Sequence, residues 1–178
     1  KGQVHRPVSG VPKARVAMLA GCVMSITHAE TLEATVRVLT RNGFEVHVTN
    51  GQGCCGALNT HSGEPDSAIK MAKTNIDSFL SMNPDAIVTA SAGCGAAMKD
   101  YDELLVNEPD YLDKAVQVAD LTKDIHELLV DYGFESPTKS LDVTVTYQDP
   151  CHLLNVQKVT AAPREILNSI PGLKLIDL

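Results

Sequence analysis

The stretch FEVHVTNGQGCCG, residues 44–56, joins a strand-like apolar run to a glycine-rich loop that holds two adjacent cysteines. Thiolates on neighbouring residues repel each other, so Cys54 and Cys55 would both be deprotonated only beside a strongly positive centre. Packing alone gives no reason for the three glycines around the pair, at positions 51, 53 and 56. The loop therefore indicates chemistry rather than a place in the hydrophobic core.

The order of strand, cysteine loop and helix recurs along the chain. Residues 14–19 form a short apolar run shortly before Cys22, and residues 86–89 form another shortly before Cys94. Both runs are typical of buried parallel strands. Helices are predicted at residues 28–42, with Thr27 and Glu30 as a capping box, at 65–82, in pieces broken at Pro109 over 97–132, and at 163–170.

Two further strands are predicted towards the end of the chain. Residues 141–147 precede Cys151, and residues 173–177 begin the last strand. Alternating strands and helices of this length imply right-handed crossovers and a mostly parallel sheet. We therefore predict an α/β fold with helices flanking the sheet, in which all four cysteine-bearing loops converge at the carboxyl ends of the strands, where such sheets bind ligands.

An internal repeat is also visible. A shift of 129 residues places Cys22 on Cys151, and it also superposes Gly43 on Gly172 and Val16 on Val145. The repeat predicts three parts: a linker at residues 1–13, a complete first unit at 14–140, and the truncated opening of a second unit at 141–178.

Several chemistries remain open for the cysteines. Flanking glycines permit positive φ and bring the sulfurs of Cys54 and Cys55 towards one point, as the ligands of a multi-iron cluster would require. Packing as a small hydrophobic side chain is the alternative, above all for Cys151. Structural zinc and a vicinal disulfide are further alternatives, although the short Cys-x₂₋₄-Cys pairs typical of zinc sites are absent. His61 and His152 are weaker candidates, expected at the surface or beside the ligands.

Composition excludes some classes of function. The formal charge is −7 with no cluster of Lys and Arg, so we expect no nucleic-acid partner. Residues 86–98 form the longest weakly polar stretch and are too short for a membrane span, which needs about 20 apolar residues. Five cysteines, an odd number, without a secretory signal indicate a reducing, cytoplasmic compartment.

Four segments carry a resemblance to a known family: Gly21-Cys22-Val23, Gly53-Cys54-Cys55-Gly56-Ala57-Leu58, Ser91-Ala92-Gly93-Cys94-Gly95 and Met98-Lys99-Asp100-Tyr101. They resemble the cysteine-rich CCG domain of heterodisulfide reductases and related iron–sulfur oxidoreductases, and most of all the iron–sulfur subunit of bacterial glycolate oxidases. In the five-cysteine pattern of that family, Cys22, Cys54, Cys55 and Cys94 match the first four positions. Ala97 stands at the fifth, and Cys151 matches the first position of a second copy.

The resemblance implies a function in electron transfer. Cys22, Cys54, Cys55 and Cys94 would hold a 4Fe–4S cluster, and Cys151 would be a further cofactor-binding position. Flavin-bearing dehydrogenase subunits, which hold the FAD, would oxidise glycolate or a similar 2-hydroxy acid and pass electrons through this domain towards the respiratory chain. A ferredoxin-like region outside this chain is implied, as is a cytoplasmic location, peripheral to the inner face of the membrane. The domain would not be catalytic alone.

Two other functions remain as alternatives. One is an assembly module without redox activity, whose cysteines bind zinc or no metal. The other is a heterodisulfide or thiol reductase module, against which the alanine at position 97 counts, because the family's disulfide chemistry uses all five cysteines.

Overall fold

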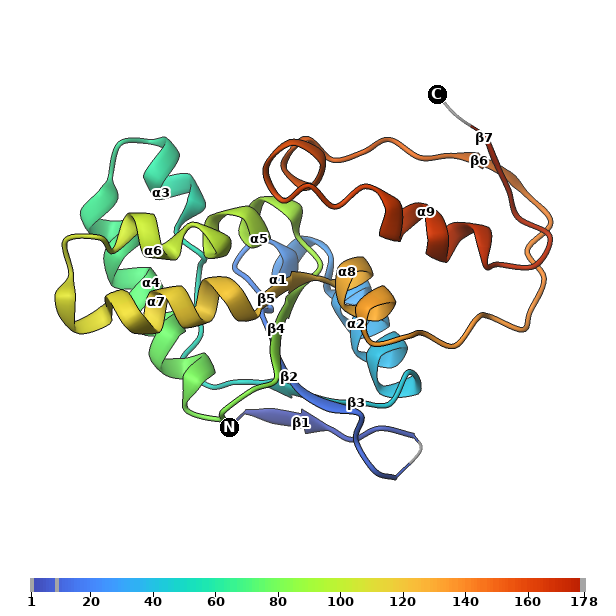
Figure 1. Cartoon of the computed structure of the whole chain (residues 1–178), viewed down its shortest axis with the longest axis horizontal. Helices are drawn as coiled ribbons and strands as arrows, with labels where there is room; N and C mark the ends of the chain where they lie inside the picture. Colours follow the sequence, from blue (N-terminus) through green and yellow to red (C-terminus); the bar gives the residue numbers. More distant parts are fainter. Residues whose placement is uncertain (1, 9, 177–178) are drawn as a thin grey trace.

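The computed structural model describes residues 2–8 and 10–176. In this part of the chain a five-stranded sheet has the order β1-β3-β2-β4-β5 (Figure 1). β2, β3, β4 and β5 are parallel, and β1 pairs antiparallel with β3 at one edge. The mostly parallel sheet predicted from the sequence is confirmed. The strands are β1 Gln3–His5, β2 Ala14–Met18, β3 Phe44–Val48, β4 Ala86–Thr89 and β5 Thr122–Asp124.

Helices cover both faces of the sheet. Side chains alternate along a strand, so Val16 and Met18 pack towards α2 and α8, whereas Ala17 and Leu19 pack towards α4 and α5. Burial on both faces explains why β2 and β4 are apolar runs rather than alternating ones. The helices around the sheet are α2 Ala29–Arg41, α4 Pro65–Leu80, α5 Ala92–Lys99, α6 Tyr101–Leu104, α7 Pro109–Leu121 and α8 Ile125–Asp131.

The start of α2 differs from the prediction. Thr27 does not cap this helix: it ends a separate turn, α1 Met24–Thr27, and its hydroxyl donates to the carbonyl of Val23. His28 precedes α2 and makes no side-chain cap bond. A reciprocal capping box does occur at α8, between Asp124 and Glu127. The spacing of Thr27 and Glu30 therefore fits the sequence pattern of a capping box, but no capping box forms, because Thr27 belongs to α1.

The segment interpreted as a linker, residues 1–13, contributes to the fold. Its strand β1 pairs with β3, with Val4 opposite His47. A three-residue strand with polar ends has no hydrophobic pattern by which sequence analysis could recognise it. Residues 3–5 are therefore an edge strand and not a linker.

The repeat seen in the sequence is present in the structure. β6 Thr144–Thr146, α9 Ala161–Asn168 and β7 Lys174–Ile176 form a second strand–helix–strand unit with parallel strands. Val16 pairs with Val46 in the main sheet, and Val145 pairs with Leu175 in the second, so both partners are displaced by the same 129 residues. Gly43 and Gly172, at equivalent positions, both have positive φ, of 90° and 79°. Asp177, predicted in the last strand, lies outside the described residues.

The second unit does not join the main sheet, contrary to the prediction. β6 and β7 form a separate two-stranded sheet within residues 10–176, and α9 lies against α8 (Figure 1). The position beside β4 is taken by β5, a short polar strand that the sequence analysis did not predict. Three cysteine loops therefore meet at the main sheet. The fourth, with Cys151, leads instead into a π-helix, η1 His152–Val156.

Gln157 holds this C-terminal unit to the helix that carries Cys94. Its side-chain Nε2 donates a 2.8 Å hydrogen bond to the carbonyl of Ala92 at the start of α5. Its Oε1 is buried without a hydrogen-bond partner among the described residues. Gly95 leaves room for this amide, since a Cβ there would lie 2.7 Å from Nε2.

We expect Gly95→Ala to displace Gln157 and to be less stable than Gly93→Ala by about 1–3 kcal/mol, the usual cost of overpacking, because the gain in helix propensity is common to both variants. Urea unfolding of the metal-free protein measures this. Gly93→Ala is the matched control, because the added Cβ meets nothing within 4 Å in the same helix and should be neutral or mildly stabilising. Equal stabilities of the two variants would show that Gly95 is not needed for this contact.

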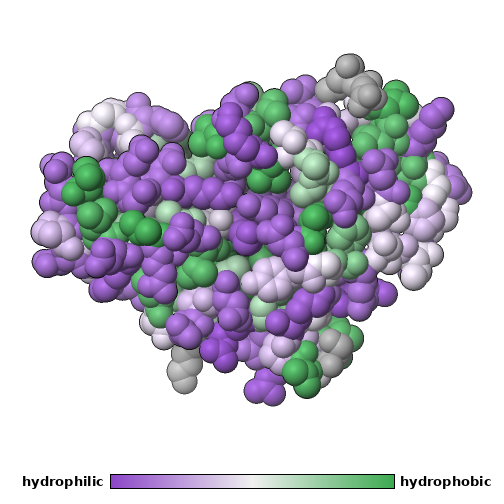
Figure 2. Space-filling view, in the orientation of Figure 1, coloured by the Kyte–Doolittle hydropathy of each residue, from purple (hydrophilic) through white to green (hydrophobic). Residues whose placement is uncertain are grey.

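Most of the surface in Figure 2 is hydrophilic, and the hydrophobic side chains on that face form separate small patches. Residues 86–98, the longest weakly polar stretch, are divided between β4 and α5. None of the helices in the described ranges has the length and apolar character that a bilayer span requires.

Candidate metal centre

Three cysteine loops meet at the carboxyl edge of the main sheet. Cys22 follows β2, the pair Cys54 and Cys55 follows β3, and Cys94 lies in the first turn of α5 after β4. β3 and β4 lie on opposite sides of β2, so the chain reverses its direction of travel across the sheet there. Open α/β sheets bind ligands at this kind of switch point.

The first contact between sulfurs joins Cys22 and Cys54. Their Sγ atoms are 3.4 Å apart, and Cys22 is exposed while Cys54 is half-buried. The hydrogen bond to Cys54 raises the pKa of the Cys22 thiol, with a smaller effect of burial. The backbone N–H of Gly56 also points at Cys54 Sγ, at 3.5 Å.

The second contact joins Cys55 and Cys94. The hydrogen bond from the Cys55 thiol lowers the pKa of Cys94 to about 6, and a hydrogen bond from Ser91 adds to this against the effect of burial. The same bond, together with burial, raises the pKa of Cys55. Cys55 is only 4% exposed. The contact thus shifts the two pKa values in opposite directions, down for Cys94 and up for Cys55.

The four sulfurs thus form two pairs that are linked through the Cys54–Cys55 peptide. Within residues 2–8 and 10–176, no three His, Cys, Asp or Glu side chains surround a point where one metal ion could bind. A 4Fe–4S cluster takes four thiolates on separate irons, and the donor set fits that requirement in number and in chemistry.

Glycine at position 56 is required by geometry. Its φ is +87°, in the left-handed region, and a Cβ there would lie 3.2 Å from the Cα of Ala68 in α4. Gly51 also has positive φ, at 88°, but Gly53 does not. Of the two glycines directly beside the pair, Gly56 thus uses the positive φ that glycine permits, and Gly53 does not.

Gln52 ties two of the cysteine loops together, a role that the sequence analysis missed. Its Oε1 accepts a 2.7 Å bond from the backbone N–H of Ala20, and its Nε2 donates to the carbonyl of Met18 at 3.0 Å. The loop before Cys54 is thus bonded to the end of β2, shortly before Cys22. The sequence offers one sign of this role. Gln52 is a long amide between two glycines, in a loop where a side chain that only faced solvent could be of almost any type.

The remaining candidates lie apart from the two thiol pairs. Cys151 is exposed at the start of η1 and joins neither pair. The rings of His61 and His152 lie close together, with centroids 6.1 Å apart and planes tilted by 52°. With Ala97 they line a cavity of about 170 Å³, and none of the described residues around it is a cysteine. Asp149, expected to shape a turn, forms a two-point ion pair with Arg164 of α9, at 2.7 and 2.6 Å.

This fold, with a row of cysteines at the switch point of a parallel sheet, defines a cysteine-rich α/β domain. The sequence profile of one such family, the CCG "Cysteine-rich domain", matches residues 16–99 and 145–178. The chain belongs to this family. The two matched segments begin 129 residues apart, which is the offset of the structural repeat.

Known relatives include iron–sulfur proteins and proteins of lactate utilisation. The chain is 38% identical to the probable glycolate oxidase iron-sulfur subunit of Bacillus subtilis (strain 168), over 97% of this chain and 40% of that protein. It is 35% identical to the glycolate oxidase iron-sulfur subunit of Escherichia coli (strain K12), over 93% and 41%. Lactate utilization protein A of Oceanobacillus iheyensis is 31% identical, over 92% and 67%. The chain spans about two fifths of the two glycolate oxidase subunits.

Proposed function

We propose that the chain is an iron–sulfur electron-transfer domain of a 2-hydroxy-acid oxidoreductase. Cys22, Cys54, Cys55 and Cys94 would be the ligands of a 4Fe–4S cluster. The observation that carries the proposal is the meeting of these four thiols from three loops at the switch point of the sheet, in two contacting pairs. When bound, the cluster supplies a centre that accepts and releases one electron at a time.

The proposed site is exposed on one side and buried on the other. Cys22 is exposed, whereas Cys55 is buried against α4 and α5. A redox partner would therefore approach from the side of Cys22, and the buried side of Cys55 would keep water from the cluster. Solvent exposure is one of the factors that set the reduction potential of such clusters.

The wider assembly is part of the proposal. Two relatives are named as iron–sulfur subunits of glycolate oxidase, which supports a flavin-bearing partner subunit as the place where the hydroxy acid is oxidised. The domain would pass electrons onward towards the respiratory chain, in the cytoplasm, at the inner face of the membrane. A ferredoxin-like region outside this chain would complete the subunit.

The second strand–helix–strand unit is assigned a related role. Residues 14–140 would be a first CCG unit and residues 141–178 the opening of a second. Cys151 would then be a cofactor-binding position of the second unit. The equal register of the two strand pairs supports this assignment.

The test is metal analysis of the whole protein, purified and reconstituted without oxygen. We expect a variant with Cys22, Cys54, Cys55 and Cys94 all changed to alanine to contain about four fewer irons and four fewer acid-labile sulfides per chain. Equal iron in both proteins would refute the proposal. Loss of one zinc and no iron would support the assembly module, and turnover of a heterodisulfide by the wild-type protein would support the thiol reductase.

A further inference from the structure

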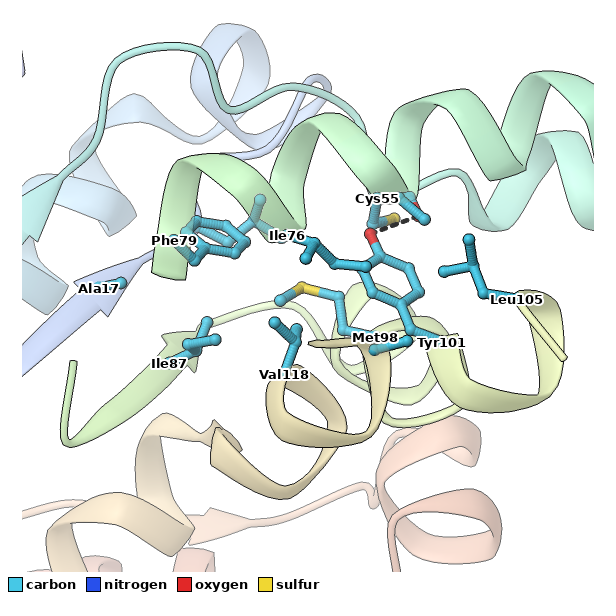
Figure 3. Packing of buried hydrophobic residues seen from close by; sticks show 12 residues of the cluster. Ala17, Cys55, Ile76, Phe79, Ile87, Met98, Tyr101, Leu105 and Val118 are labelled. Carbon is cyan, nitrogen blue, oxygen red and sulfur yellow. Dashed lines mark hydrogen bonds between the residues drawn. The ribbon is translucent and has the colours of Figure 1, made fainter. Parts of the chain in front are cut away.

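Two polar side chains lie in the core directly beneath the vicinal cysteines. Asn75 of α4 and Tyr101 of α6 are both 0% exposed. Burial of an amide or a hydroxyl is costly unless its hydrogen bonds are satisfied inside the protein. Tyr101 stands among apolar neighbours, and in Figure 3 its ring lies between Ile76 and Leu105 with its hydroxyl turned to Cys55.

The hydrogen bonds of this pair all concern the cysteine loop or each other. Asn75 Oδ1 accepts from the backbone N–H of Gly53 at 2.8 Å, and Asn75 Nδ2 donates to the carbonyl of Cys54 at 2.8 Å. Tyr101 donates its hydroxyl to the carbonyl of Cys55 at 3.0 Å and accepts from Asn75 Nδ2 at 3.2 Å. Three successive residues of the loop therefore have a backbone group bonded to this pair.

The bonds restrain the peptide that separates the two thiol pairs. Cys54 turns its sulfur to Cys22, and Cys55 turns its sulfur to Cys94. A rotation of the backbone between them would change the position of one sulfur relative to the other. With the carbonyls on both sides bonded, that rotation would break buried hydrogen bonds.

We propose that Asn75 and Tyr101 are positioning residues that preorganise Cys54 and Cys55 for ligand binding. The inference rests on the proposed iron–sulfur function of the same site. Packing alone does not account for the pair: leucine and phenylalanine would fill the same apolar space without burying an amide and a hydroxyl. Neither could bond the carbonyls of the loop.

The experiment compares Tyr101→Phe with Tyr111→Phe in the whole protein. Each change removes one hydroxyl, but that of Tyr111 is on the outside and bonds Asp77, at 2.7 Å, on the same helix as Asn75. The first readout is the rate of alkylation of each cysteine in the metal-free protein, resolved by peptide mass spectrometry. The second is the rate at which a chelator removes iron from the reconstituted protein.

We expect Tyr101→Phe to increase both the alkylation of Cys55 and the loss of iron by about tenfold, the factor that corresponds to 1.4 kcal/mol. Tyr111→Phe should change either rate by less than about twofold. Cys151 is exposed, so its alkylation rate is the internal reference and should not change. A general loosening of the fold would raise the alkylation rates of Cys55 and Cys94 alike. A rise confined to Cys54 and Cys55 is the signature of positioning.

Asn75→Leu removes three of the bonds and should have a larger effect in the same direction. If it does not fold, the tyrosine comparison decides alone. Equal rates for Tyr101→Phe and Tyr111→Phe in both readouts would overturn the inference while iron binding by the wild-type protein upheld the proposed function. If the wild-type protein binds no iron, the proposed function is refuted. Faster alkylation of Cys55 in Tyr101→Phe than in Tyr111→Phe would then still uphold the positioning.

Discussion

Cys55→Ser should remove most of the cluster iron, because serine is nearly isosteric with cysteine but is a poor ligand for an iron–sulfur cluster. Of the four thiols, Cys55 is the most buried, at 4% exposed, so no water or exposed side chain can easily replace it. Iron and sulfide content and the visible absorption of the reconstituted whole protein measure the loss. We expect a decrease of about four irons per chain relative to wild type.

The control for this experiment is His61→Ala. His61 lies six residues after Cys55 at the end of α3 Ala57–His61, and it faces His152 rather than the thiol pairs. It should retain its iron. Circular dichroism of the metal-free Cys55→Ser protein should match wild type, since the substitution leaves the packing in place. Full iron content and an unchanged visible spectrum in Cys55→Ser would contradict the assignment of Cys55 as a ligand.

Gly56→Ala should destabilise the metal-free protein by about 2–4 kcal/mol. The left-handed backbone at φ +87° costs an alanine about 1–2 kcal/mol. The added Cβ would also press on the backbone of Ala68, 3.2 Å from its Cα and 3.3 Å from its oxygen, and a helix backbone cannot move aside as a flexible side chain can. The midpoint of urea unfolding reports the change.

Gly63→Ala separates the two contributions. Gly63 has nearly the same φ, +76°, but a Cβ there meets nothing within 4 Å. This variant should lose only about 1–2 kcal/mol, from backbone strain. If both variants lose the same free energy, the close approach of Ala68 does not matter, and Gly56 is selected for its conformation alone.

The sequence predicted those parts of the fold whose signal is local. Residues 14–19 and 86–89 are mostly apolar runs in strands that have helices on both faces, and residues 44–49 alternate between buried apolar and less buried polar side chains. Both patterns are typical of strands. The sequence analysis did not predict β1 and β5, because three-residue strands with polar ends have no periodic pattern. The sequence analysis also did not predict that β6 pairs in a separate sheet, because the pattern of one strand does not specify its neighbour.

The same distinction applies to the site. All four thiols that meet at the sheet edge were candidates from the sequence, since the strand order places their loops at one edge. Their pairing was not predictable, because it depends on which way each side chain of the vicinal pair turns. Asn75 and Tyr101 contact the loop over separations of 21 to 46 residues, and no local pattern links them to it. The available signs were a polar residue at an apolar position of α4 and the presence of Tyr101 in one of the segments that carry the family resemblance.

Gln157 couples the C-terminal unit mechanically to the metal centre. It bonds the carbonyl of Ala92, two residues before Cys94, and its amide lies on Gly95 directly after that cysteine. Any tilt or withdrawal of η1 would therefore pull on the one turn of helix that carries a thiol of the buried pair. A force on the second repeat would thus reach the helix turn of Cys94 through Gln157, besides the packing of α9 on α8.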